Sequence, residues 1–198
     1  ADIIEAMTTD VQLVVLPSVL YVSGQLLDMP AITAAAKARG ILIGWDLSHS
    51  VGVVPHQLEE ISADFAFWCN YKYLNAGPGA IGGLFLHPRH HDAAPGLAGW
   101  WGVQPDRRFD LNPQHEPAGG AARLQVGTPP ILSLAPLAGS LDLFETAGGI
   151  TAVRQRSLEL TQQLLGRVER ELIPLGFELI TPRHHAERGG HIALRHPA

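Results

Sequence analysis

Two residues of this sequence stand where an apolar segment gives way to turn-forming sequence, and both could take part in chemistry. Lys72 follows the segment DFAFWCN (64–70) and is one of only two lysines among the 14 basic residues. Small or turn-forming residues occupy 75–80, directly after it. Asp46 follows the apolar segment Ile41–Trp45. A lysine amine that has lost its proton is a nucleophile, and a carboxylate holds a proton or a positive charge at a fixed point.

A lysine and a carboxylate in this setting suit pyridoxal phosphate. The cofactor binds an amine as a Schiff base, and an anionic partner keeps its pyridine nitrogen protonated so that the ring can accept electrons. Burial and cationic neighbours can lower a lysine pKa from about 10.4 to about 7–8, which frees the amine to react. The ordinary alternative is that Lys72 is a solvated surface residue and that Asp46 forms a turn or a helix cap.

The pattern of the first 90 residues predicts the elements that would bring these two residues together. Between the first two predicted strands, Asp28 caps a helix with Pro30 in its first turn, and Gly40 ends it. Strand, helix and strand in succession form a βαβ unit, hence a parallel sheet. Ligands of such sheets bind beyond the carboxyl ends of the strands, where Asp46 and Lys72 would be neighbours. Apolar runs predict strands at Val11–Pro17, Ile41–Trp45, Ala63–Cys69 and Ala80–Leu86.

The second half of the chain begins with a loop region and continues as helices. Residues 87–128 show little periodicity and many Pro, Gly and His residues, which indicates a functional loop region. Helical periodicity begins at Ile131, is interrupted at 148–149, and continues to about residue 172. The second helix is expected to bury a stripe of five residues: Val153, Leu160, Leu164, Val168 and Leu172.

The last residues indicate a second, smaller unit. Phe177–Thr181 and His191–His196 are predicted strands. We therefore expect residues 1–140 to belong to a large cofactor-binding domain. Residues 141–198 would form connecting helices and the start of a small α/β domain. The chain is also expected to be a piece of a longer protein.

The composition excludes several classes of protein. Apolar residues make up 46% and charged residues 17% of the 198 residues, which is typical of a globular chain. A net charge of −5 argues against nucleic acid or an anionic membrane as a partner. The single cysteine, Cys69, excludes an internal disulfide and favours a reducing compartment. With neither a signal-peptide pattern nor an apolar run near the ~20 residues of a membrane span, we expect a cytoplasmic protein.

Three segments around these residues resemble one enzyme family. They are DLSHSVGVVP (46–55), DFAFWCNYKYLNAGPGAIGG (64–83) and AGWWG (98–102). Together they resemble kynureninase, a family of pyridoxal-phosphate enzymes of the aspartate aminotransferase fold (fold type I). The resemblance extends over nearly the whole chain, and the block around Lys72 is highly specific. It implies an α/β fold with a mostly parallel sheet.

The resemblance implies roles for the residues near the two strand ends. Lys72 would bind the cofactor covalently, and Asp46 would pair with its pyridine nitrogen. His49 would lie beside the cofactor and help to organise it. Tyr71 would reach the cofactor phosphate and relay protons during catalysis. Taken alone, His49 could instead cap a helix, and Tyr71 could simply lie on one face of a sheet.

Two more residues match phosphate-binding positions of the family. Trp100 matches a tryptophan whose indole N–H reaches the phosphate, and Thr128 in VGTPP matches a second such residue. In the family both come from the neighbouring subunit, so the resemblance implies a homodimer with shared active sites. Thr128 also favours L-kynurenine, because Asn at this position is associated with the 3-hydroxylated substrate. Taken alone, a Trp-Trp-Gly sequence more often indicates packing.

The implied reaction is the hydrolysis of L-kynurenine, and possibly 3-hydroxykynurenine, to anthranilate and L-alanine in tryptophan catabolism. The enzyme would be a hydrolase acting on a carbon–carbon bond in a ketonic substrate. The family's phosphate-cradling turn and ring-stacking aromatic residue lie upstream of Ala1, and its substrate-binding arginine lies downstream of Ala198. We therefore expect these 198 residues alone to bind the cofactor poorly. The alternatives are another enzyme of the fold, such as a cysteine desulfurase or an aminotransferase, and a non-catalytic fragment or interaction module that retains the fold.

The remaining reactive side chains are assigned ordinary roles. His87, His90 and His91 lie in a polar, proline-containing loop, so we predict no metal site there. The same holds for the adjacent histidines at 184–185. Cys69 is expected to be a buried, inert cysteine.

Overall fold

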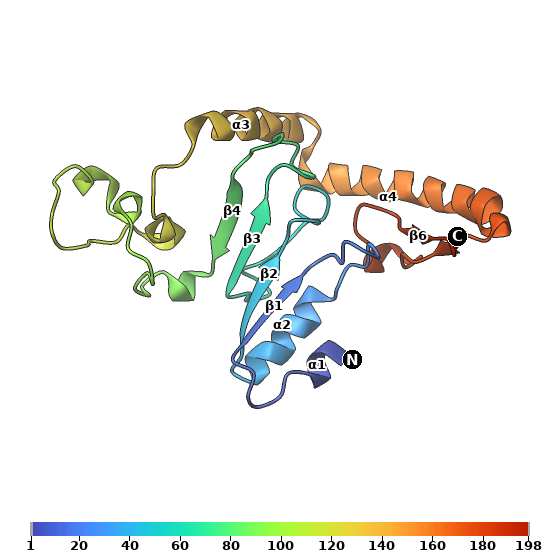
Figure 1. Cartoon of the computed structure of the whole chain (residues 1–198), viewed down its shortest axis with the longest axis horizontal. Helices are drawn as coiled ribbons and strands as arrows, with labels where there is room; N and C mark the ends of the chain where they lie inside the picture. The colour runs from blue at the N-terminus through green and yellow to red at the C-terminus, as the bar shows by residue number, and fades with distance from the viewer. Residues whose placement is uncertain (1, 198) are drawn as a thin grey trace.

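The computed structural model describes residues 2–197, which contain a four-stranded sheet, flanking helices and a small two-stranded sheet at one side (Figure 1). The first three strands are parallel, and the fourth is antiparallel to the third. The predicted mostly parallel sheet is therefore confirmed. The last strand turns back because residues 70–81 form turns and not the helical crossover of a parallel connection. The strand order is β1 (Leu13–Pro17), β2 (Leu42–Asp46), β3 (Phe65–Cys69) and β4 (Gly82–Leu86).

The helix between β1 and β2 begins and ends at the residues that the sequence indicates. In α2 (Met29–Ala38), the Asp28 carboxylate accepts a hydrogen bond from the Ala31 amide at 3.0 Å. Gly40 has a φ of 70°, a left-handed conformation that favours glycine. The chain can therefore leave the helix and enter β2 at once.

One face of the sheet is packed against α2. Ile43 and Trp45 of β2 are fully buried there, and Ile32 and Ala36 of α2 cover them. The Trp45 indole N–H donates to the Thr33 hydroxyl at 3.1 Å, which satisfies the one polar atom that this ring carries into the core. Burial of these side chains holds β2 in place, and β2 ends in Asp46.

The opposite face of the sheet remains open within residues 2–197. Parallel sheets are normally covered on both faces, and the apolar runs of the sequence fit that arrangement. The exposed fractions are 38–50% for five apolar side chains of this face: Leu13, Val15, Leu42, Phe67 and Leu84.

A buried carboxylate joins the start of β3 to the turn after β4. Asp64 accepts hydrogen bonds from the Ile43 amide at 2.8 Å, the Arg89 guanidinium at 2.7 Å and the His90 ring at 2.7 Å. Burial raises the pKa of Asp64, but these three partners outweigh burial and hold the pKa below its ordinary value. His90 thus has a structural partner, and residues 2–197 hold no cluster of three or more potential metal ligands.

Residues 87–128 form a loop region that extends away from the sheet beyond β4 (Figure 1). The Ala118 amide donates to the Gly102 carbonyl at 2.8 Å, and the Arg108 guanidinium lies 3.8 Å above the Trp101 ring. These contacts give the loop region a structure of its own. Its helical turns are η1 (Pro88–His90), η2 (Trp100–Gly102), η3 (Pro105–Arg107) and η4 (Gly120–Leu124).

Two helices follow, α3 (Ile131–Thr146) and α4 (Gly149–Arg167), with a break at the predicted place. The predicted stripe of α4 is wrong in part, because Leu160 and Leu164 are 48% and 46% exposed. Val168 of the predicted stripe is buried, and the other buried positions are Thr161 and Leu165. They face the C-terminal segment, whose buried Arg188 side chain reaches the Thr161 hydroxyl.

The C-terminal segment closes with two short strands. A π turn and a 3-10 turn continue α4 through Val168–Leu172 and Ile173–Leu175. β5 (Glu178–Leu179) and β6 (Leu194–Arg195) then pair antiparallel and are shorter than predicted. Across residues 2–197, none of the helices combines the length and apolar character needed to cross a membrane.

Candidate functional site

The sheet brings Asp46 and the segment before Lys72 to one edge. β2 and β3 are adjacent and parallel, and Asp46 is in register with Phe67. The Leu47 amide then donates to the Phe67 carbonyl at 2.9 Å, one step beyond the end of β2. Lys72 follows β3 at the same edge. The expectation that the carboxyl ends of the two strands are neighbours is thus confirmed.

Ser48 connects these two strand ends, a role that the sequence analysis missed. Its amide donates to Asp46 Oδ1 at 2.8 Å, and its hydroxyl accepts from the Cys69 amide at 3.2 Å. The first bond fixes the orientation of the Asp46 carboxylate, and the second connects Ser48 to β3, the strand that leads to Lys72. The local signal was the Asp-Leu-Ser sequence, since an aspartate often accepts from the amide two residues on.

The turn that carries Lys72 is shaped by its small neighbours. The Asn75 amide donates to the Lys72 carbonyl at 3.0 Å, and Asn75 itself has a φ of 55°. A Cβ atom on Gly52, in the loop after β2, would lie 2.7 Å from the Tyr73 carbonyl oxygen. Only glycine permits this contact, which presses the loop after β2 against the Lys72 turn.

His49 lies between the charged groups of the site. Burial lowers its pKa, the charges of Lys72 and His191 lower it further, and Asp46 acts in the opposite direction. Lys72, His191 and Asp46 are therefore within electrostatic range of His49, and the His49 imidazole is mostly neutral at pH 7. Tyr71 stands at the rim, 51% exposed, with its ring centre 5.6 Å from the Lys72 nitrogen.

The chemistry of this group of side chains fits pyridoxal phosphate. The part-buried Lys72 and Asp46 form no salt bridge with any residue in the range 2–197, and Asp46 Oδ2 has no hydrogen-bond donor there. An amine, a neutral imidazole and a carboxylate with a free oxygen are thus grouped at the carboxyl ends of parallel strands. That is the position at which open α/β sheets bind ligands.

Trp100 and Thr128 are not brought to this group. Trp100 belongs to η2 in the loop region, where its ring centre lies 5.1 Å from that of Trp101 and 6.2 Å from that of Phe109. Thr128 is exposed. Within the described residues, neither side chain has a hydrogen bond or a ring contact with the groups around Lys72. The exposed side chains of Trp100 and Thr128 are both accessible to another molecule.

Behind Asp46 lies a buried polar chain that the sequence analysis did not single out. His56 Nε2 is 2.8 Å from the Ser50 hydroxyl, which is 2.6 Å from the Ser18 hydroxyl. Ser18 in turn donates to the Asp46 carbonyl at 3.3 Å. Burial lowers the pKa of His56 from 6.5 to about 4, so this imidazole is neutral at pH 7.

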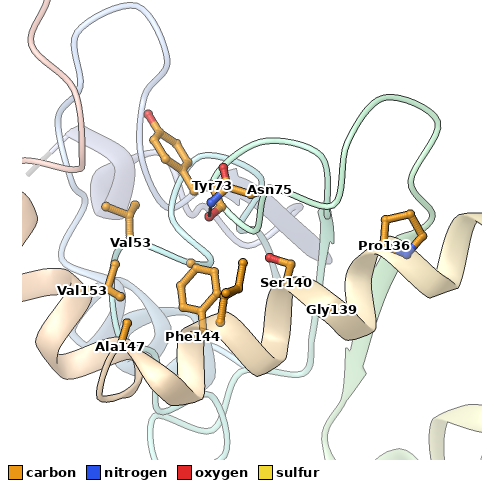
Figure 2. Close-up of a pocket in the computed structure, with 11 residues that line it drawn as sticks. Val53, Tyr73, Asn75, Pro136, Gly139, Ser140, Phe144, Ala147 and Val153 are labelled. Carbon is orange, nitrogen blue, oxygen red and sulfur yellow. Dashed lines mark hydrogen bonds between the residues drawn. The ribbon is translucent and has the colours of Figure 1, made fainter.

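A groove of about 740 Å³ is separate from this site. It lies between α3 and the turn after Lys72, and Figure 2 shows Ser140 and Phe144 pointing from α3 toward Tyr73 and Asn75. Its lining is mainly apolar and includes neither Asp46 nor His49 nor Lys72. The groove therefore supplies no group for the chemistry considered above.

Comparison with known proteins assigns the chain to a family. The model of the aminotransferase class-V family matches residues 1–196. A kynureninase of Geobacillus thermodenitrificans is 52% identical over 195 residues, and one of Bacillus thuringiensis subsp. konkukian is 50% identical. In both cases the match covers 98% of this chain and 45% of the relative. The chain thus spans less than half the length of the curated relatives that it matches.

Solved structures agree on the fold. A cysteine desulfurase from Thermococcus onnurineus superposes with a TM-score of 0.77 at 22% identity, covering 98% of this chain and 46% of that protein. The protein C-DES with glycine covalently linked to its PLP cofactor superposes with a TM-score of 0.75 at 21% identity, over 93% and 47% of the two chains. These similarities define the fold alone.

Proposed function

We propose that this chain, which belongs to the aminotransferase class-V family, forms the lysine-bearing part of a kynureninase. The observation that carries the proposal is the 52% identity with the Geobacillus kynureninase over 98% of the chain. The proposed reaction is the hydrolytic cleavage of a carbon–carbon bond in L-kynurenine to give anthranilate and L-alanine. The protein is then a hydrolase of tryptophan catabolism with pyridoxal phosphate as its cofactor.

The residues at the two strand ends have different roles in this proposal. When bound, pyridoxal phosphate supplies an electron sink for the carbanion next to the substrate amine. Lys72 binds the cofactor and exchanges protons at Nζ. Asp46, oriented by Ser48, holds the proton on the pyridine nitrogen. His49, neutral at pH 7, lies beside the cofactor without adding a positive charge to it.

The phosphate is bound by residues from two subunits in this proposal. Tyr71 reaches it from the same chain, and its exposed ring at the rim is free to do so. Trp100 and Thr128 reach it from the neighbouring subunit of a homodimer, which accords with their exposed positions away from Lys72. Thr128 favours plain L-kynurenine over its 3-hydroxy form.

The domain division and the compartment belong to the same proposal. Residues 1–140 are the C-terminal part of the cofactor-binding domain, and residues 141–198 form connecting helices and the start of a small domain. The separate pairing of β5 with β6 supports this division. The protein acts in the cytoplasm on a small molecule, without nucleic acid or membrane.

A cysteine desulfurase is the second candidate, because the cysteine desulfurase from Thermococcus onnurineus shares the fold at a TM-score of 0.77. The two activities differ in their products. A kynureninase releases the fluorescent product anthranilate from L-kynurenine, whereas a desulfurase leaves kynurenine unchanged and converts L-cysteine to alanine.

The test uses the purified protein in its natural length, loaded with pyridoxal phosphate. We expect anthranilate from L-kynurenine, and borohydride reduction should attach the cofactor to Lys72. Lys72→Ala should abolish both the attachment and the turnover. Lys37→Ala, which changes the exposed second lysine on α2, is the matched control and should alter neither. Attachment to Lys37, or conversion of cysteine with no anthranilate, would contradict the proposal.

A further inference from the structure

The C-terminal segment is bonded directly to the loop between β1 and α2. The Leu26 amide donates to the Glu187 carbonyl at 2.8 Å, and the Gly189 amide donates to the Gly24 carbonyl at 2.8 Å. The Thr181 hydroxyl donates to the Ser23 carbonyl at 2.6 Å. Two segments about 160 residues apart in the sequence are thus held side by side along several residues.

His191 extends this contact to the site. Its Nε2 lies 3.1 Å from the Tyr21 carbonyl oxygen, and its Nδ1 lies 3.3 Å from the Tyr73 hydroxyl. A carbonyl only accepts, so Nε2 carries the proton, and Nδ1 is left to accept from Tyr73. A Cβ atom on Gly24 would lie 2.8 Å from the His191 carbonyl oxygen, so the backbone of His191 is seated against a glycine.

Both partners of His191 adjoin the reactive group. Tyr73 follows Lys72 in the sequence, and its hydroxyl points away from α3 (Figure 2). The ring of Tyr21 stacks on His49 with centres 5.9 Å apart and an angle of 27°. The His191 ring itself lies 6.5 Å from His49. One imidazole therefore contacts the turn that carries Lys72 and the loop that supports His49.

We propose that His191 is a positioning residue of this site: by accepting from Tyr73 and donating to Tyr21, it fixes the Lys72 turn and the stacking partner of His49. The C-terminal segment thereby becomes part of the cofactor site. The inference rests on the proposed function only in taking pyridoxal phosphate as the ligand.

The interaction needs a neutral His191 and a protonated Tyr73. Burial raises the pKa of Tyr73, which keeps its hydroxyl a donor. The charged and titratable groups that act on His49 at this place are Lys72, Asp46 and His191 itself. A proton on Nδ1 would remove the acceptor for Tyr73 and add a positive charge beside His49.

The test is a double-mutant cycle read by pyridoxal-phosphate affinity in the natural-length protein. His191→Ala and Tyr73→Phe should each weaken binding by about fivefold to tenfold, the usual effect of one hydrogen bond. The double variant should be no weaker than His191→Ala, because Tyr73→Phe removes an interaction that His191→Ala has already removed. His191→Gln should restore most of the affinity, since its amide can both donate to Tyr21 and accept from Tyr73.

A second readout needs no cofactor and no turnover. In the apoprotein at pH 7.5, the NMR shifts of the His49 ring protons should change more in His191→Ala than in His191→Gln. Only His191→Ala leaves the carbonyl of Tyr21, the residue whose ring stacks on His49, without its hydrogen-bond donor. His184→Ala, which changes an exposed histidine of the same segment, is the matched control and should leave the His49 ring-proton shifts unchanged.

Three results would overturn the inference: additive losses in the cycle, a His191→Gln variant as weak as His191→Ala, or His49 ring-proton shifts that are unchanged in His191→Ala. Failure of the proposed function has a different signature. In that case the wild-type protein forms no anthranilate, while the NMR comparison still detects the influence of His191 on His49.

Discussion

The part-buried imidazole of His56 should make the stability of the fold depend on pH. His56 has a folded-state pKa of about 4 against an ordinary value of 6.5, because burial disfavours its charged form. The unfolded chain therefore binds a proton more readily than the folded chain between these two values. Stability from this residue is complete above pH 6.5 and is lost as the pH falls toward 4.

The size of the effect follows from the two pKa values. When His56 is protonated in the unfolded state but not in the folded state, the free energy of unfolding can fall by at most about 3 kcal/mol. This limit follows from about 1.4 kcal/mol for each tenfold difference in proton affinity. At pH 5 about 2 kcal/mol should already be lost relative to pH 7.5. His56→Gln can keep a hydrogen bond to Ser50 but cannot be charged, so its stability should fall less over this range.

Urea denaturation of both proteins at pH 7.5, 6 and 5 measures the effect. The free energy of unfolding of the wild type should fall by about 2 kcal/mol more than that of His56→Gln between pH 7.5 and 5. The other histidines are present in both proteins, so their contributions cancel in the difference. Parallel pH curves for the two proteins would refute the reasoning, as would an NMR pKa of His56 near 6.5.

Two more perturbations test the supports of the site. Gly52→Ala should destabilise the fold by about 2–3 kcal/mol, because its Cβ atom would lie 2.7 Å from the Tyr73 oxygen. Gly79→Ala, which has a similar φ of 81° but open space, should cost only about 1 kcal/mol. Equal midpoints of thermal unfolding in these two variants would contradict the packing argument. Asp64→Asn should cost about 2 kcal/mol, because the Arg89 guanidinium loses its buried partner; denaturation at pH 7 measures this, and an unchanged midpoint would count against it.

The sequence was sufficient for the parts of the fold that depend on neighbouring residues. Strands β1 to β3, the Asp28 cap and the break before α4 all have local signals, and each is present in the structure. The adjacency of the Asp46 and Lys72 strand ends followed from the βαβ pattern, because parallel strands end at the same edge of a sheet.

Contacts between distant segments were decided by the tertiary structure. The buried face of α4 differs in part from the predicted stripe, because Arg188 of the C-terminal segment packs on Thr161. When a helix has apolar residues on several sides, the periodicity of its sequence does not determine which side is buried. The direction of β4 was likewise set by the turns that follow Lys72.

The same division holds for the site. The sequence alone indicated Lys72 and Asp46 as candidate residues, because each is a reactive side chain that directly follows an apolar run. It could not identify His191, which acts through a hydrogen bond to a residue 118 positions away. A bond of that kind depends on how two loops are packed, and only the folded chain determines the packing.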